Sequence, residues 1–453
     1  MIGFHWQTLS QWISHGAAYD SAERSPAPRC HPRTRTEILN KIDEWVKPPV
    51  KGGTKSFLWL HGPAGAGKSA IAQTVAETCA DRGQLAASFF FSRSSPDRNA
   101  LKYLFPTIIF QISMSSHSKR QKLQEILRDD PGIAYRTSGS INLLVSLFRD
   151  PPGALHDDST IPASPFLVII DGLDECRGNK DQSSILSDVH DLVHKHCLPL
   201  RFLIVSRPES HIRETLDKSA MSSITEVLSV YGDFGARDDV KTYLRDEFRR
   251  IQDSEMHQDI MQFVPKPWPS DSVIEQIVEK SGGYFIYAAT VIKYVDEEYF
   301  SCLDRLDEAL GSSTAQHDPE ETPFAELDRL YSSVLSTCPK SQLPHLKRAL
   351  AIIGDRPRVS AMEVFFDLRP GQLKLTLRGL RSIVAVSDGA DEGRLYSFHA
   401  SFLDFLFDPA RAKDYYVDRE QCYVSNFHRL FSLVSQSIRA PGAQNRLESF
   451  VVT

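Results

Sequence analysis

The chain has 453 residues, a formal net charge of −6, 41% hydrophobic residues and 24% charged residues, which are the values of a soluble globular protein with two to four domains. This acidic balance provides no broad basic surface, so nucleic acid is not an expected partner. The seven cysteines are scattered without a C-x-x-C pair, which predicts free thiols in a reducing compartment.

The N-terminal sequence lacks the basic start and the continuous apolar segment of a signal peptide. The longest apolar run, residues 284–292, has nine residues and is about half as long as a membrane span. We therefore predict a cytoplasmic protein that has no membrane partner.

The chain begins with a lead-in, residues 1–29, in which Leu9, Ile13 and Ala17 recur at helical spacing before a proline-containing loop. The next block, residues 30–232, alternates short apolar runs with helical patterns, the clearest helix being residues 68–82. Such alternation predicts an α/β domain with a parallel sheet covered on both faces. The five predicted strands are residues 57–62, 85–91, 166–171, 201–206 and 224–230.

Beyond this block the sequence predicts a helical domain over residues 233–355, in which Ser272 and Glu275 have the spacing of a capping box. Residues 356–410 predict a helix, a β-hairpin and a second helix, which is a winged-helix layout. Residues 411–453 form an amphipathic C-terminal tail. No internal repeat is found in the sequence.

The sequence GPAGAGKS at residues 62–69 fits the phosphate-loop pattern G-x-x-x-x-G-K-[ST] in full. It follows a predicted strand and opens a predicted helix, which is the context that the motif requires. Its glycines let the backbone wrap closely around phosphates, and the loop amides point at the anion. Lys68 is expected to reach the β- and γ-phosphates, and Ser69 to ligate Mg²⁺. The predicted nucleotide-binding residues are Gly62, Gly65, Ala66, Gly67, Lys68, Ser69 and Ala70.

The sequence FLVIIDGLDEC at residues 166–176 places three carboxylates at the end of an apolar strand. With a phosphate loop upstream, Asp171 is the expected Walker B ligand of Mg²⁺. Metal binding needs one acid, so Asp174 and Glu175 indicate a role in polarising the water that attacks the γ-phosphate. Which of the two acts as the base stays open, and a solvated acidic turn that caps the next helix is the alternative interpretation.

At this point the sequence resembles the NACHT module of the STAND class of signal-transduction NTPases, nearest the fungal nephrocystin-type group. The resemblance spans roughly residues 30–407. Walker B of the form D-G-x-D-E together with SRPE is its specific part, whereas the phosphate loop alone is widespread. The motifs that carry it are CHPRTRTEIL, FLWLHGPAGAGKSAIAQTVAE, LAASFFFSR, FLVIIDGLDEC, LRFLIVSRPE and FHASFLDFL.

The resemblance implies roles for particular residues. Arg207 in VSRPE matches the sensor arginine that reads the γ-phosphate, and a guanidinium suits that contact. His399 in FHASFLDFL matches the winged-helix histidine that touches the β-phosphate of ADP. Arg33 and Arg35 lie in the segment that leads into the adenine pocket. The family's G-x-P motif corresponds here to GGYFIYA, which lacks the proline expected against the base.

The resemblance implies a slow ATPase that binds ATP or ADP with Mg²⁺ and couples the nucleotide state to self-association. A remodelling ATPase of the AAA+ type and a non-catalytic scaffold that binds nucleotide for structure are the two rival functions. Winged helices also bind DNA, and Lys374 and Arg378 lie on a possible recognition helix, but the acidic chain argues against that function. Family members carry repeats after the winged helix and none is found here, which leaves a fragment, a truncated product or a partner-dependent adaptor as open expectations.

Overall fold

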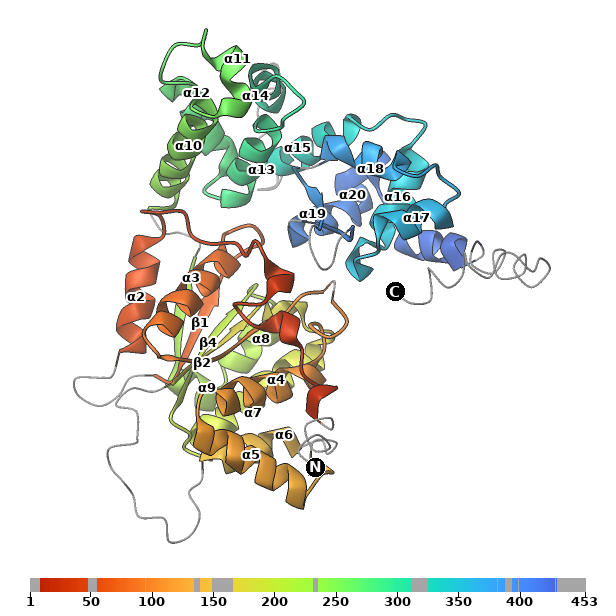
Figure 1. Cartoon of the computed structure of the whole chain (residues 1–453). Helices are drawn as coiled ribbons and strands as arrows, with labels where there is room; N and C mark the ends of the chain where they lie inside the picture. Colours follow the sequence, from red (N-terminus) through yellow and green to blue (C-terminus); the bar gives the residue numbers. More distant parts are fainter. Residues whose placement is uncertain are drawn as a thin grey trace, which may run out of the picture. The chain divides into compact units, whose positions relative to one another are not determined.

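The computed structural model divides into two compact units, residues Met1–Asp233 and Phe234–Thr453, which are described separately (Figure 1). The structure describes residues 9–47, 55–93, 95–133, 139–148, 166–230, 235–310, 325–380, 382–387, 393–397, 399–427 and 429. The C-terminal tail predicted over residues 411–453 therefore lies largely outside the described residues.

The first unit is built on a parallel sheet with the strand order β2-β3-β4-β1-β5, which confirms the predicted α/β fold with five parallel strands. The strands are β1 Phe57–His61, β2 Leu85–Phe90, β3 Phe166–Asp171, β4 Leu200–Ser206 and β5 Thr225–Ser229. They coincide with the apolar runs because both faces of a central parallel strand are buried. Since β4 pairs with both β1 and β3, the carboxyl ends of these three strands are neighbours.

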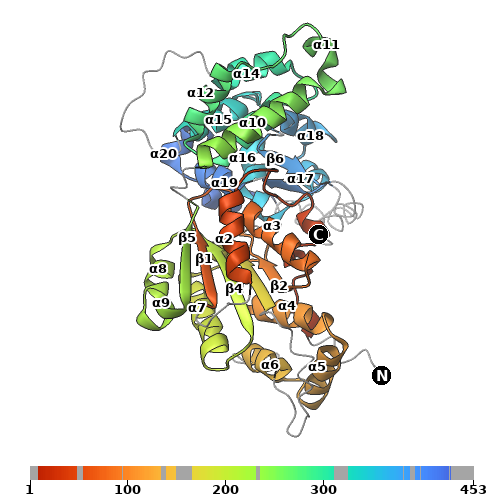
Figure 2. The same ribbon diagram turned by 90° about the vertical axis from the view of Figure 1, so that its left-hand side faces the viewer.

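Helices cover both faces of this sheet (Figure 2). On one face α3, Lys68–Asp81, contacts β2, β3 and β4 and packs beside α2, Thr36–Val46. The helices whose apolar residues join the core on the other face are α4 Leu101–Met114, α5 His117–Asp129, α6 Gly139–Phe148, α7 Asn179–His194, α8 Ser210–Leu216 and α9 Ser219–Ile224.

The lead-in wraps around the edge strand β2. Leu9 and Ala17 are buried in the core on the α4 side, and the Ser14 amide donates to the Thr107 hydroxyl of α4. The amide of Tyr19 then bonds the Ser88 hydroxyl of β2. The expected helix over the start of the lead-in does not continue through this segment, which instead forms the 3-10 helices η1, His15–Ala17, and η2, Ala22–Arg24. The amides of Ser14 and Tyr19 bond side chains of α4 and β2, so they are not available for helical hydrogen bonds.

The second unit is mainly helical and has one continuous apolar core. A two-stranded antiparallel hairpin, β6 Val384–Val386 and β7 Leu395–Ser397, lies between α18 and α19, in the helix, hairpin, helix order that the sequence predicts. Its helices are α10 Ala236–Gln252, α11 Gln258–Met261, α12 Asp271–Ser281, α13 Phe285–Val295, α14 Cys302–Leu310, α15 Ala325–Ser336, α16 Leu343–Ala351, α17 Val359–Phe365, α18 Gln372–Thr376, α19 Ala400–Leu406 and α20 Pro409–Ala412.

The predicted capping box does not form at the start of α12. Ser270, not Ser272, is the N-cap residue, and its side chain makes no capping hydrogen bond. The two hydroxyls bond each other instead, at 2.8 Å. The helix therefore begins two residues before the position that the pattern predicts.

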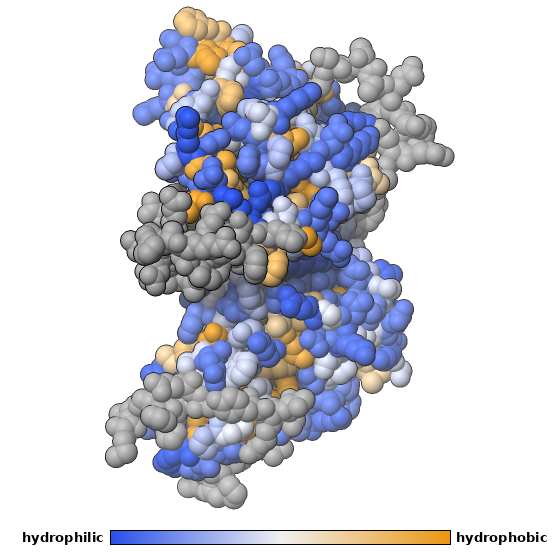
Figure 3. All heavy atoms as spheres, turned by 90° about the vertical axis from the view of Figure 1, so that its right-hand side faces the viewer, coloured by the Kyte–Doolittle hydropathy of each residue, from blue (hydrophilic) through white to orange (hydrophobic). Residues whose placement is uncertain are grey.

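Among the described residues, no helix combines the length and apolar character needed to cross a membrane. On the face drawn in Figure 3, hydrophilic residues predominate and hydrophobic residues form small separate groups.

Candidate functional site

The phosphate-loop sequence, residues 62–69, connects β1 to the first turn of α3. Gly65 and Gly67 adopt φ angles of +73° and +86°, in the region that favours glycine. A Cβ atom at Gly67 would meet nothing within 4 Å, so the backbone conformation rather than lack of space requires glycine there. The loop thus turns its backbone toward the N-terminus of α3, where helix amides favour an anion.

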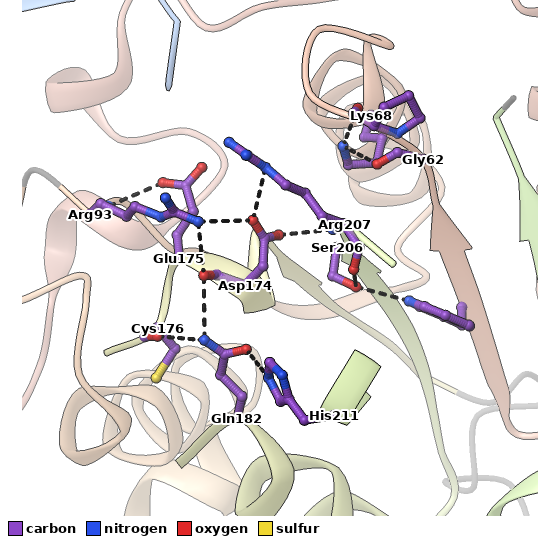
Figure 4. A network of polar contacts seen from close by, with 12 residues as sticks. Gly62, Lys68, Arg93, Asp174, Glu175, Cys176, Gln182, Ser206, Arg207 and His211 are labelled. Atoms are coloured by element: carbon purple, nitrogen blue, oxygen red, sulfur yellow. Dashed lines mark hydrogen bonds and ion pairs between the residues drawn. The ribbon is translucent and has the colours of Figure 1, made fainter. Parts of the chain in front are cut away.

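The Lys68 ammonium folds back over this loop. Its Nζ atom donates to the carbonyl oxygens of Gly62 and Pro63, both at 2.8 Å (Figure 4). Burial lowers the pKa of Lys68, while the carboxylates of Asp174 and Asp171 act in the opposite direction. A phosphate group would give this buried ammonium stronger, charge-assisted hydrogen bonds than the two neutral carbonyls do.

Asp171 ends β3 and is only 4% exposed. Its Oδ1 atom has no hydrogen-bond partner among the described residues. Burial raises the pKa of this carboxyl, and a side-chain hydrogen bond from Ser69 opposes the rise. A buried carboxylate oxygen beside a hydroxyl is the oxygen donor set that suits Mg²⁺, so Asp171 and Ser69 fit the ion that the resemblance implies.

Asp174 lies in η4, Leu173–Glu175, and holds two arginines (Figure 4). The backbone amide of Arg207 donates to its Oδ1 atom at 2.9 Å, and the Arg207 Nε atom lies 3.2 Å from Oδ2. Arg93, in the loop after β2, reaches the same Oδ2 atom from the other side at 3.5 Å. Both oxygens of the Asp174 carboxylate thus contact Arg207, which directly follows β4.

Glu175 has different surroundings from Asp174. Its Oε2 atom accepts a hydrogen bond from the Arg93 backbone amide at 3.1 Å. Burial, followed by the charge of Asp174, raises the pKa of Glu175 to about 7. A carboxyl with a pKa near neutrality has the property expected of a general base.

Behind these groups lies a second network that sequence reasoning missed. The Gln182 amide of α7 donates to the carbonyl oxygens of Cys176 at 2.7 Å and Asp174 at 3.3 Å. The His211 ring of α8 lies 2.7 Å from the Gln182 Oε1 atom. These contacts fix the turn that carries both acids. Only Arg93 had a usable sequence signal, since it closely follows an apolar strand of the same sheet.

The remaining predicted residues lie in three places. Ala70 follows the loop in the first turn of α3. Arg35 is buried and donates to the Ala66 carbonyl at 3.0 Å, whereas Arg33 is exposed. His399 is an exposed residue of the second unit, at the N-cap of α19. The first unit thus brings together all the predicted site residues except His399.

Residues 34–207, less than half of the chain, match the family model described as nephrocystin 3, N-terminal. A search among curated proteins gave no significant match. Similar solved structures include the Cdc6 protein of Pyrobaculum aerophilum, with 14% identity and a TM-score of 0.38 over 88% of this chain and 98% of that chain. The Aeropyrum pernix Orc1 protein in complex with DNA has 15% identity and a TM-score of 0.34, over 84% of this chain and 91% of that chain.

A Drosophila ORC structure, also bound to DNA, has 12% identity and a TM-score of 0.33, over 85% of this chain and 97% of that chain. The expectation that nucleic acid is no partner receives no support from these matches. The sheet, the phosphate loop and the carboxylate at the end of β3 together define the class of the chain, which has a P-loop nucleoside triphosphatase fold. Within that class, the particular match is the nephrocystin 3 N-terminal region.

Proposed function

We propose that this chain is an ATP-dependent signalling switch of the NACHT type. It binds ATP or ADP with Mg²⁺, hydrolyses ATP slowly, and changes its self-association with the nucleotide that it holds. Such a switch works because its two states contact the two nucleotides differently. We further propose that it acts in the cytoplasm and that the chain comprises the five segments predicted from the sequence.

The observation that carries this proposal is that Asp174 and Glu175 differ in their contacts, which suits them to different roles. Asp174 contacts both the backbone amide and the side chain of Arg207. These contacts fix the position of Arg207 at the end of β4. Glu175, with a pKa of about 7 raised by burial, is left as the base. A chain that used nucleotide only as a structural ligand would have no need of a second acid with these properties.

The chemical steps follow from these positions. Lys68 and the loop amides bind the β- and γ-phosphates, and Arg207 contacts the γ-phosphate. Glu175 takes a proton from water as its oxygen attacks the γ-phosphorus, and the bond from phosphorus to the ADP oxygen breaks. A bound Mg²⁺ held by Ser69 and Asp171 would neutralise charge on the phosphates. Because the output is the nucleotide state, we expect slow turnover.

The first test of this function is mass spectrometry of the nucleotide that copurifies with the protein, together with calorimetry of the Lys68→Ala variant. We expect bound ADP in the wild-type protein and no measurable ATP binding in the variant, because the loop loses its cation. Unchanged ATP affinity in Lys68→Ala would contradict the nucleotide site. Fast basal turnover by hexameric rings would favour a remodelling ATPase, and an oligomeric state that is the same with ADP and ATP would favour a scaffold.

A further inference from the structure

The second half of the lead-in runs along the face of the sheet that carries α3. We call residues 14–35 the strap. After Tyr19 it bonds α3 at Thr74, whose hydroxyl accepts from the Cys30 amide at 3.0 Å. It also forms an exposed ion pair between Arg29 and Glu77. The strap therefore follows the helix that begins with the phosphate loop.

Arg24 is a half-buried residue of the strap that contacts both α3 and β2. Its Nη1 atom donates to the Gln73 Oε1 atom of α3 at 2.8 Å and to the Tyr19 carbonyl at 3.2 Å. Its guanidinium carbon lies 3.5 Å from the centroid of the Phe90 ring. The guanidinium is thus fixed between a helix and a strand of the nucleotide domain.

Gln73 and Phe90, the residues that Arg24 contacts outside the strap, are neighbours of the predicted metal ligands. Gln73 is four residues after Ser69 on α3, so the two share one face of the helix. Phe90 is the register partner of Asp171 across β2 and β3, so their side chains leave the same face of the sheet, on strands about 4.8 Å apart. Arg24 therefore lies beside the pair formed by Ser69 and Asp171.

Arg24 stays charged at neutral pH in this position. Burial lowers the pKa of Arg24 to about 10, and the Asp171 carboxylate is the strongest of the groups that oppose this shift. Burial raises the pKa of Asp171, and among the cations that oppose that rise Arg24 acts more strongly than Lys68. The strap thus supplies a fixed positive charge next to the place where Mg²⁺ is expected.

We propose that Arg24 is a positioning residue that sets how strongly the nucleotide site depends on Mg²⁺. Its charge attracts the phosphates of a nucleotide that arrives without metal, and it repels a divalent ion between Ser69 and Asp171. With Arg24 present, the site therefore binds metal-free nucleotide more tightly than the phosphate loop alone would. Added Mg²⁺ then strengthens nucleotide binding less than it would without Arg24. This inference rests on the proposed nucleotide site and extends it to the lead-in.

The test compares the affinity for a fluorescent ADP analogue in EDTA and in saturating Mg²⁺. In Arg24→Met, which keeps an apolar side chain against Phe90, the affinity in EDTA falls. The ratio of the dissociation constants in EDTA and in Mg²⁺ rises by about three- to thirty-fold, as expected for one charge at close range. A purely structural role would weaken both affinities together and leave that ratio unchanged, which would overturn the proposal.

Two variants complete the experiment. Arg24→Lys keeps the charge, so its ratio stays near the wild-type value, whereas a ratio equal to that of Arg24→Met would overturn the proposal. Arg29→Met removes the same charge from an exposed part of the same strap, where solvent screens it, and leaves the ratio unchanged. If the wild-type protein binds no ADP analogue in either buffer, the proposed function itself fails. Binding without a change of ratio in Arg24→Met overturns only the role of Arg24.

Discussion

Asp174 and Glu175 are adjacent in the chain, but their side chains make different contacts: Asp174 faces two guanidinium groups, whereas Glu175 accepts the backbone amide of Arg93. Asp174 is buried against Arg207 and Arg93. Glu175 accepts a backbone amide and is surrounded by protein and like charge, which raise its pKa to about 7. We infer that the first acid positions an arginine and that the second acts on water, so their amide variants should behave differently.

We predict that Glu175→Gln binds ATP with wild-type affinity but hydrolyses it about a hundred- to ten-thousand-fold more slowly, the usual loss of a general base. The glutamine side chain has the same size and keeps the oxygen that accepts the hydrogen bond from the Arg93 amide, so the turn is preserved. Single-turnover hydrolysis of radiolabelled ATP measures the rate. A rate equal to wild type would mean that the acid only caps a turn.

In contrast, Asp174→Asn should lose discrimination between ATP and ADP. The amide retains an oxygen for the Arg207 backbone, but it removes the charge that faces two guanidinium groups. Arg207 is then no longer fixed where the γ-phosphate is expected. Calorimetry should show a weaker preference for ATP over ADP, and equal preference in wild type and variant would contradict this role of Asp174.

The pKa of Glu175 also predicts a pH dependence of hydrolysis. A base works in its deprotonated form, and the pKa of this carboxyl is about 7, raised by burial. The value of kcat/KM, which reports the free enzyme, should therefore rise with pH through neutrality and level off above it. At pH 6 it should be about tenfold below the plateau. The same rise persisting in the residual activity of Glu175→Gln would assign it to another group.

At the scale of single elements, a buried carboxylate organises the start of α18. Glu363 of α17 is 6% exposed, and its two oxygens accept the backbone amides of Gly371 and Leu373 at 2.8 Å and of Lys374 at 3.2 Å. These amides belong to the first turn of a helix, which has no partners for them within the helix itself. The contact ties α17 to α18 ahead of the hairpin.

We predict that Glu363→Ala lowers the free energy of unfolding of the second unit by about 1–3 kcal/mol, because several amides lose a charged acceptor. Urea unfolding followed by circular dichroism measures the change. Glu420→Ala, at an exposed carboxylate of the same unit, is the matched control and should change stability by less than about 0.5 kcal/mol. Equal effects of the two substitutions would rule out a specific role for Glu363.

The strands and the phosphate loop were predictable from sequence because their signals are local. An apolar run marks each buried strand, and GPAGAGKS has its own pattern. The division between Asp174 and Glu175 was not predictable, since it depends on Arg207 and Arg93, which approach from other strands of the sheet. The exact start of a helix was not predictable from its sequence pattern either, since the helix expected to begin at Ser272 has its N-cap at Ser270.

The strap was missed for a related reason. Its residues are mostly polar and have little periodicity, so the sequence predicted that its first part, up to residue 29, is a lead-in outside the nucleotide domain. The structure places it in the same compact unit as the sheet, where it makes hydrogen bonds to β2, α3 and α4. It also makes the ion pair of Arg29 with Glu77 and the contact of Arg24 with the Phe90 ring. Such contacts depend on tertiary structure alone, and no sequence pattern encodes them.

At the scale of the whole molecule, the proposed switch requires the nucleotide to act on both units. All predicted site residues but one belong to the first unit, and the exception is His399, exposed at the N-cap of α19. The resemblance implies that this histidine contacts the β-phosphate of ADP. Lys68 is expected to bind the same phosphate, so ADP would stabilise one state of the two units and ATP another.

We therefore predict that His399→Leu releases ADP faster and forms oligomers at lower ATP concentrations than the wild-type protein. A charge-assisted hydrogen bond is worth about 1.5–3 kcal/mol, which corresponds to a shift of about ten- to hundred-fold in a two-state population. Stopped-flow release of a fluorescent ADP analogue and light scattering measure the two effects. His117→Leu, at an exposed histidine that begins α5, is the matched control and should leave both unchanged. Unchanged ADP release in His399→Leu would mean that the hairpin region does not sense the nucleotide, and the coupling would then have to pass through another part of the second unit.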